Sequence, residues 1–225
     1  MQSLSRISAT ILAAVATSAL TAGVALAATI DGGPRGERLR GTNGPDRVEG
    51  HGGPDRIRAL AGDDVLAGGW GRDVVHGGLG DDAGSGGPGR DLMAGGPGDD
   101  RQDGGPGSDV IFANRGVDET WGGAGDDALW AMARADVTPG PNGEVDTVAD
   151  TLHGGPGNDR FRTRDGEADR IDCGAGRDVA FLDPVDVIVD ATPENANGSC
   201  EVVHRAAPAP RDDAREDAAE PTPAS

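Results

Sequence analysis

Aromatic residues are scarce in this chain of 225 residues: they make up 3% of it, and tyrosine is absent. Glycine, in contrast, occurs 39 times. With so few large apolar side chains, a conventional packed core is not expected. Basic residues are outnumbered too, with 20 Lys and Arg against 39 Asp and Glu. The formal net charge of -19 argues against a nucleic-acid partner and for a cation partner or a solvated acidic surface.

Long hydrophobic runs are missing except at the N-terminus. Arg6 precedes an apolar run over residues 7–27 that ends in an A-x-A cleavage pattern, Ala25-Leu26-Ala27. This pattern predicts a secretory signal peptide over residues 1–27, with an uncleaved membrane anchor as the alternative. We therefore expect a secreted, extracellular protein without membrane association after cleavage.

Cysteine is limited to Cys173 and Cys200. An even number of cysteines in an exported chain favours a disulfide, which would stabilise the C-terminal end by roughly 3 kcal/mol through loop closure. A metal site that uses both thiolates and His204 is the alternative, but it lacks a fourth ligand.

The sequence does contain a strict internal repeat. Ten aspartates follow one another at intervals of nine residues: Asp46, Asp55, Asp64, Asp73, Asp82, Asp91, Asp100, Asp109, Asp118 and Asp127. Such a period predicts a solenoid whose units cannot bury their apolar faces alone. Each unit divides into a turn of the form G-G-x-G-x-D and a short segment x-U-x, in which U is apolar and points to one face of a strand.

Units such as "GGPGRDLMA" from residue 86 and "GGPGSDVIF" from residue 104 resemble the nonapeptide repeats of the RTX (haemolysin-type) calcium-binding family. The resemblance implies an all-β parallel β-roll in which several Ca²⁺ ions lie between the turns. It assigns the ligand role to the sixth-slot aspartates of this sequence: Asp46, Asp55, Asp64, Asp73, Asp82, Asp91, Asp100, Asp109, Asp118, Asp127, Asp146, Asp159, Asp169 and Asp178. Other aspartates stay unassigned, namely Asp31, Asp136, Asp183, Asp190 and the aspartates of the C-terminal tail.

Stacked coils would place aspartates of alternate units about 4.8 Å apart along two edges, where unneutralised carboxylates repel one another. Calcium accepts six to eight oxygen ligands, which carboxylates and glycine carbonyls supply, whereas magnesium demands stricter geometry and zinc prefers His or Cys.

The residue type in the apolar U slot alternates from one unit to the next. One set of units offers Ile57, Val75, Met93, Ile111 and Leu129, and the other offers Val48, Leu66, Gly84, Gln102 and Thr120. One sheet should therefore have a continuous apolar row while the other loses it halfway, which makes the middle coils depend on the metal.

The period also predicts the organisation of the chain. We expect the following segments: a lead with one degenerate unit (28–40), the regular roll (41–130), an interrupted continuation with a closing strand (131–190), a disulfide-linked cap (191–205) and a disordered acidic Pro/Ala tail (206–225).

Three aromatic residues, Phe112, Trp121 and Trp130, fall in the outward-facing ninth slot. They form a candidate ligand surface, so the alternative function is a calcium-stabilised adhesin or carbohydrate-binding module that contacts cell-surface or matrix components. Aromatics that merely cover the roll beside the enlarged loop at 131–142 are the simpler interpretation.

The chain contains no H-E-x-x-H, G-x-S-x-G or P-loop motif. Paired carboxylates such as Asp81 and Asp82 are the usual groups for acid-base chemistry, but the second of each pair is the repeat's ligand slot. We therefore expect a calcium-binding protein rather than an enzyme, and a small hydrolase with an unrecognised site is the third hypothesis.

Overall fold

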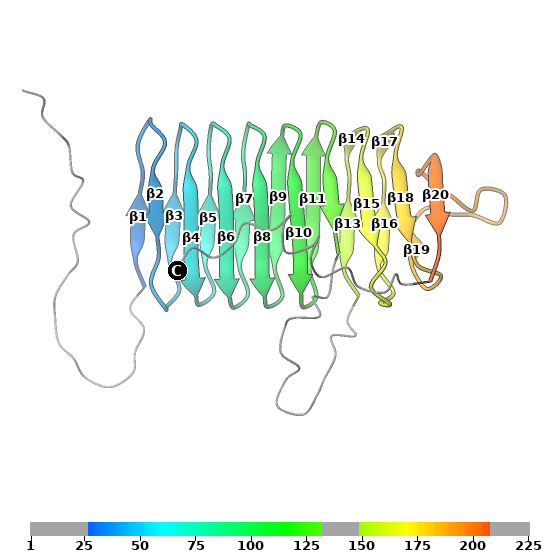
Figure 1. Cartoon of the computed structure of the whole chain (residues 1–225), viewed down its shortest axis with the longest axis horizontal. Helices are drawn as coiled ribbons and strands as arrows, with labels where there is room; N and C mark the ends of the chain where they lie inside the picture. The colour runs from blue at the N-terminus through cyan, green and yellow to red at the C-terminus, as the bar shows by residue number, and fades with distance from the viewer. Residues whose placement is uncertain (1–26, 132–148, 208–225) are drawn as a thin grey trace, which may run out of the picture.

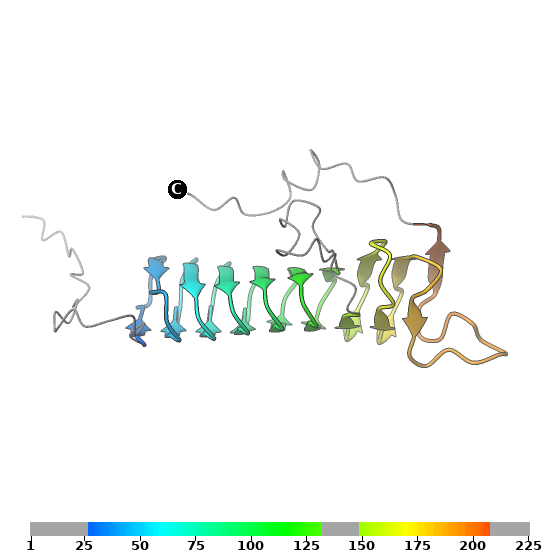
Figure 2. The same ribbon diagram turned by 90° about the horizontal axis from the view of Figure 1, so that it is seen from below.

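The computed structural model describes residues 27–131 and 149–207, which form two long parallel β-sheets lying back to back (Figures 1 and 2). Strands of the two long sheets alternate along the chain, so that one strand from each sheet makes one coil. The predicted all-β parallel β-roll is confirmed. No helix among the described residues has the length and apolar character needed to cross a membrane.

Each sheet contains nine strands. Sheet A consists, in spatial order, of β1 (Thr29–Asp31), β3 (Arg47–Glu49), β5 (Val65–Ala67), β7 (Ala83–Ser85), β9 (Arg101–Pro106), β11 (Glu119–Ala124), β13 (Thr151–His153), β16 (Arg170–Asp172) and β19 (Val187–Ile188). Sheet B consists of β2 (Arg38–Arg40), β4 (Arg56–Ala61), β6 (Val74–Leu79), β8 (Leu92–Pro97), β10 (Val110–Arg115), β12 (Ala128–Trp130), β15 (Arg160–Thr163), β18 (Val179–Leu182) and β20 (Val202–Arg205). A small third sheet pairs β14 (Pro156–Gly157) with β17 (Ala175–Gly176).

The register is set by the repeat. In sheet B, Val75 faces Met93 and Met93 faces Ile111, so that each partner lies one coil, or two nonapeptides, further along the chain. Successive side chains of a strand point to opposite faces, and the middle residue of each three-residue segment therefore points inward. Because residues in the same slot of successive coils pair in register, they form a continuous row of side chains along the sheet.

The interior differs between the two sheets, as the sequence predicts. Sheet B contributes a buried apolar row, with Ile57, Val75 and Met93 at 2% exposure or less. In sheet A the corresponding positions in the middle coils are Gly84, Gln102 and Thr120, and the last two are buried. Two apolar clusters result, one from Val48 to Ile111 and one from Leu129 to Ile188.

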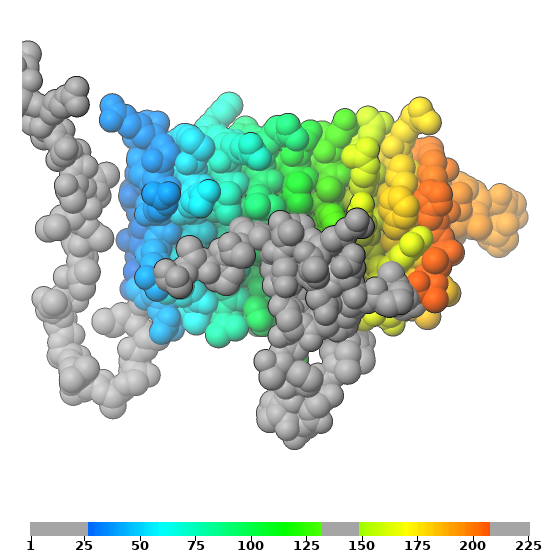
Figure 3. All heavy atoms as spheres, in the orientation of Figure 1, coloured from blue at the N-terminus to red at the C-terminus, as the bar shows by residue number. Residues whose placement is uncertain are grey.

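The C-terminal strands continue the roll rather than covering it. β18 lies in sheet B and β19 in sheet A, while β20 extends sheet B beyond β18. The loop between β19 and β20 projects from the C-terminal end of the block in Figure 3. The predicted disulfide between Cys173 and Cys200 ties this loop to the last coils, with 5.3 Å between the two Cα atoms.

Several predicted segments fall mostly outside the described residues. They are the signal peptide (1–27), the enlarged loop (131–142) and the Pro/Ala tail (206–225). The described roll already starts at β1 and β2, within the segment that the sequence predicts to be a lead (28–40).

Candidate metal sites

Two rows of buried aspartates run along the two edges of the roll, each aspartate lying directly before a strand. Ladder A precedes the strands of sheet A and consists of Asp46, Asp64, Asp82, Asp100, Asp118, Asp150 and Asp169. Ladder B precedes the strands of sheet B and consists of Asp55, Asp73, Asp91, Asp109, Asp127, Asp159 and Asp178. Every ladder residue is at most 5% exposed.

One carboxylate oxygen of each ladder aspartate is fixed by the neighbouring coil. The backbone N–H of Asp73 donates to Oδ1 of Asp91 at 2.8 Å, and the N–H of Asp91 donates to Oδ1 of Asp109 at 2.7 Å. The same bond recurs along ladder A, where Asp82 donates to Oδ1 of Asp100 at 2.7 Å. Because the bonds link successive coils, every carboxylate has the same orientation.

The second carboxylate oxygen, Oδ2, is buried without a hydrogen-bond partner in most ladder residues. This group comprises Asp55, Asp64, Asp73, Asp82, Asp91, Asp100, Asp109, Asp127, Asp159, Asp169 and Asp178. A buried polar atom without a partner is costly, and a regular row of such oxygens indicates a missing ligand rather than an accident of packing.

The glycines explain where such a ligand would lie. A Cβ added to Gly86 would come within 2.6 Å of Oδ2 of Asp91 and 2.8 Å of the carbonyl oxygen of Gly104 in the next coil. The next residue, Gly87, has a φ of +91°, which residues with a side chain rarely adopt. The first two glycines of the unit thus keep open a turn that is lined by a carboxylate oxygen and a backbone carbonyl.

Burial raises the pKa of ladder carboxylates in the middle coils. In ladder A burial, reinforced by neighbouring carboxylates, raises the pKa of Asp82 to about 7 and that of Asp100 to about 8. In ladder B the pKa of Asp91 rises to about 6 and that of Asp109 to about 7, again chiefly through burial. Near neutral pH the ladders therefore need either protons or cations to compensate their charge.

The two edges differ in the residue before each ladder aspartate. On the edge of ladder A this slot holds Asp63, Asp81 and Asp99, which form a second, exposed row in which Asp81 N–H donates to Asp63 Oδ1 at 3.1 Å. On the edge of ladder B the same slot holds Arg72, Arg90 and Arg177, with one acidic residue, Asp126. Ladder A is consequently the more acidic edge.

The predicted ligands that lie within the described residues all stand in the two ladders, and one further aspartate joins them. Asp146 lies outside the described residues, and Asp150 occupies the ladder position between Asp118 and Asp169. The spacing from Asp118 to Asp150 is 32 residues instead of 18, because the chain is longer there. Asp150 follows from the sequence once the period is counted backwards, since it lies nine residues before Asp159.

The ends of the ladders carry acidic residues that the repeat does not predict as ligands. Asp186 accepts the N–H of Asp169 at 3.2 Å and so follows ladder A, and Glu201 accepts the N–H of Asp178 at 2.7 Å and follows ladder B. Glu37 precedes ladder B, with its N–H donating to Asp55 at 2.7 Å. Asp183, left unassigned from the sequence, is fully buried.

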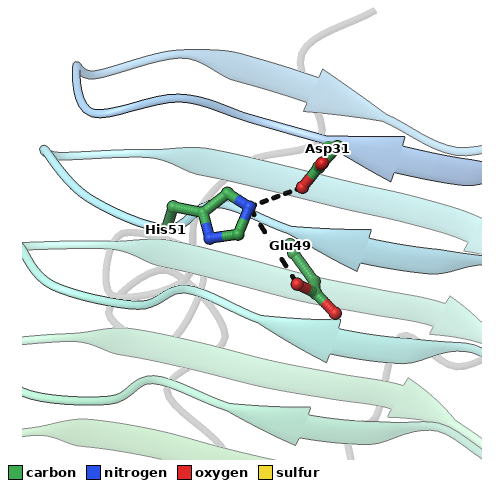
Figure 4. Close-up of side chains that lie close together, drawn as sticks. All are labelled: Asp31, Glu49 and His51. Carbon is green, nitrogen blue, oxygen red and sulfur yellow. Dashed lines mark hydrogen bonds and ion pairs between the residues drawn. The ribbon is translucent and has the colours of Figure 1, made fainter.

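A different group of possible metal ligands lies on the outer surface near the N-terminus (Figure 4). Nε2 of His51 lies 2.5 Å from Oδ1 of Asp31 and 4.0 Å from Oε2 of Glu49. His51 and Asp31 are exposed, and the group has no buried oxygen that demands a cation. We interpret it as a surface hydrogen bond and assign no metal to it.

The three aromatics of the ninth slot do not form one surface, and Phe112 is buried, at 4% exposure. Phe112 and Trp130 lie on sheet B with ring centroids 5.4 Å apart. Trp121 lies on sheet A, where it stacks on His153 at 5.6 Å.

A parallel roll edged by buried carboxylate oxygens and glycine carbonyls defines a repetitive oxygen-donor, cation-binding solenoid. The sequence model of the RTX calcium-binding nonapeptide repeat matches residues 31–53, 49–83, 85–120, 95–129, 103–136 and 146–180. These matches cover more than half of the chain, which therefore belongs to this family, and membership implies calcium binding. A search of curated proteins finds no match. No enzymatic domain is evident in the residues that the structure describes.

Proposed function

We propose that this chain is a secreted, non-catalytic protein whose β-roll folds around several calcium ions held by the two ladders. The observation that carries the proposal is the row of buried Oδ2 atoms without partners, repeated once per coil on both edges. In the regular units, such as those of Asp73, Asp91 and Asp109, this oxygen faces the first glycine of its own unit, where a carbonyl of the next coil also lies.

The donor set favours calcium over other divalent ions. Carboxylate and carbonyl oxygens line the ladder turns, and these are the ligands of a hard cation that tolerates varied geometry. A bound ion would join two adjacent coils, so that binding at one turn would order the next. Extracellular calcium modules commonly bind at roughly 10⁻⁴ to 10⁻³ M, which would leave the roll unfolded at cytosolic calcium and folded after export.

A calcium titration followed by circular dichroism tests this proposal. The chelated protein should show little β structure, and calcium in the millimolar range should restore it cooperatively. Magnesium at the same concentration should leave the spectrum unchanged, because it needs near-ideal octahedral geometry. A β spectrum that is complete in chelator, or restored equally by magnesium, would refute the proposed role.

A second candidate function, binding of a carbohydrate or another surface ligand, rests on sheet B. There Arg162 lies over the ring of Trp130 at 4.5 Å and over that of Phe181 at 5.8 Å, and Phe181 stacks on His204 at 4.9 Å. Such a row of rings and a guanidinium can stack on flat sugar faces. Glycan-array binding with calcium present, lost in Trp130→Ala, tests this function separately from calcium binding.

A further inference from the structure

The turn between β15 and β16 departs from the repeat in a way that adds carboxylates. Aligned on the ladder residue Asp169, this turn has Asp165 and Glu167 where regular units have their second and fourth-slot glycines. The side chains of this turn therefore add acidic oxygens at a position where regular turns offer only backbone carbonyls.

Three carboxylates from two adjacent coils converge here. Asp150, Glu167 and Asp169 each present an oxygen within 4.8 Å of those of the other two, and they are 2%, 7% and 0% exposed. Oδ1 of Asp169 accepts the N–H of Asp150 at 2.9 Å, while its Oδ2 is buried without a partner. Oδ2 of Asp165 is likewise buried without a partner.

The next coil supplies a rigid acidic support. Oδ2 of Asp186 accepts the hydroxyl of Thr163 at 2.6 Å and the N–H of Asp183 at 2.8 Å. Oδ2 of Asp183 accepts the N–H of Gly166 at 2.8 Å, which holds the irregular turn in place. Arg205 donates to the backbone carbonyls of Asp183 and Asp186.

Positive charge is missing from the middle of this group. Among the described residues, no ion pair joins Asp150, Asp165 or Asp169 to an arginine. Burial and the neighbouring carboxylates raise the pKa of Asp150 to about 9 and that of Asp169 to about 10. A bound cation would let these groups ionise together.

We propose that Asp150, Glu167 and Asp169, with Asp165 beside them, form a calcium site of a second kind, which binds one Ca²⁺ more tightly than the ladder turns do. The inference rests on the proposed calcium function. It adds that the calcium sites fill in a defined order, with this site first. Affinity in oxygen-donor calcium sites rises with the number of charged ligands and with rigidity. Two adjacent regular turns present two ladder carboxylates and glycine carbonyls, whereas this site adds Glu167, with Asp165 beside it, to its two ladder carboxylates.

Calcium calorimetry on the oxidised full-length protein tests the site. The wild type should show one tight ion followed by a weaker class. Glu167→Gln should weaken the tight class by about tenfold or more and leave the weaker class unchanged. The control Glu194→Gln, which removes the same charge from an exposed loop, should behave as wild type. The pair Asp91→Asn and Asp109→Asn should weaken only the weaker class.

The outcomes separate the two proposals. If Glu167→Gln binds calcium as the wild type does while the ladder variant loses affinity, the tight site is wrong and the ladder function stands. If no protein of the set binds calcium, both are wrong. Anomalous diffraction from wild-type crystals with one equivalent of terbium gives a readout that does not depend on a variant's folding. The first peak should lie between Asp150, Glu167 and Asp169, and a first peak in a regular ladder turn would overturn the inference.

Discussion

The middle coils and the C-terminal coils share one backbone plan but differ in what fills the interior. In the middle coils sheet A contributes Gly84, Gln102 and Thr120, and the buried Oε1 of Gln102 and Oγ1 of Thr120 have no hydrogen-bond partner. The C-terminal coils instead bury Leu152 and Phe161 completely. We infer from this difference that the ladders maintain the geometry of the middle coils, where the apolar core does not.

A solenoid's stability is approximately a sum over neighbouring units, so the two regions can be perturbed separately. The middle coils bury polar groups of sheet A at a cost, and only the apolar row of sheet B and the ladders compensate it. The C-terminal coils add the apolar cluster around Phe161 and the Cys173–Cys200 disulfide. Calcium should therefore matter most between β7 and β11.

The largest effect is expected from removing ladder charges in the middle coils. Asp91→Asn together with Asp109→Asn should raise the calcium concentration at the folding midpoint by about tenfold or more, because each side chain presents a buried oxygen to its turn. The control pair Asp103→Asn and Glu194→Gln removes two exposed carboxylates and should leave the midpoint unchanged. Circular dichroism during calcium titration measures both, and equal shifts would contradict the assignment of the ladder slots.

Protons should partly replace calcium. The pKa of Asp82 is raised to about 7 and that of Asp100 to about 8, so in the absence of cations the folded roll binds more protons than the unfolded chain, in which an aspartate titrates near 3.8. The resulting stability is fully present below pH 3.8 and is lost as the pH rises through about 7 to 8. In chelator, β structure should increase as the pH is lowered from 8 to 4. A spectrum that loses β structure on acidification would contradict this linkage.

Reducing the disulfide should affect the C-terminal coils and not the middle coils. Loss of the Cys173–Cys200 bond should destabilise the C-terminal coils by about 3 kcal/mol through loop-closure entropy. Calcium-loaded protein should then show faster amide exchange in β16 and β18, with β4 and β6 unchanged. Uniform acceleration along the roll would show that the two regions do not behave separately.

The smallest effect is expected at Gly84, and Gly86, close to it in sequence, serves as the contrast. Gly84→Ala should stabilise the middle coils by about 0.4–1 kcal/mol, because Gly84 has an ordinary φ and a Cβ there would meet only the flexible end of Met93, at 3.2 Å. Gly86→Ala should instead abolish calcium-induced folding of its coil, since its Cβ would lie against Asp91 Oδ2 and the Gly104 carbonyl. Thermal melts in saturating calcium distinguish them, and a stabilised Gly86→Ala would exclude the turn as the ion's position.

Much of the fold and of the ladders could be predicted from the sequence, because each slot of the repeat has a fixed position in a coil. The period of nine predicts a solenoid with rows of aspartates and uneven inner rows of Met93 and Gln102, and the resemblance to the RTX repeats implies the β-roll. The period alone did not predict Asp150, since an insertion shifts the count, although counting back from Asp159 finds it.

The acidic group around Glu167 was beyond sequence reasoning for a different reason. Its carboxylates come from separate coils, and only the stacking of β13, β16 and β19 brings Asp150, Asp169 and Asp186 together. The separation of Trp121 from Trp130 follows from the alternation between sheets, which the shared ninth slot conceals.

Hydrogen exchange with and without calcium, resolved by strand, tests the central claim most directly. With calcium, the amides of β7, β9 and β11 should be as well protected as those of β15 and β18. In chelator at neutral pH, the middle strands should exchange at the rate of an unfolded chain and lose more protection than the C-terminal strands. Equal protection of the middle strands in calcium and in chelator would show that the aspartate ladders do not need a cation to hold the roll together.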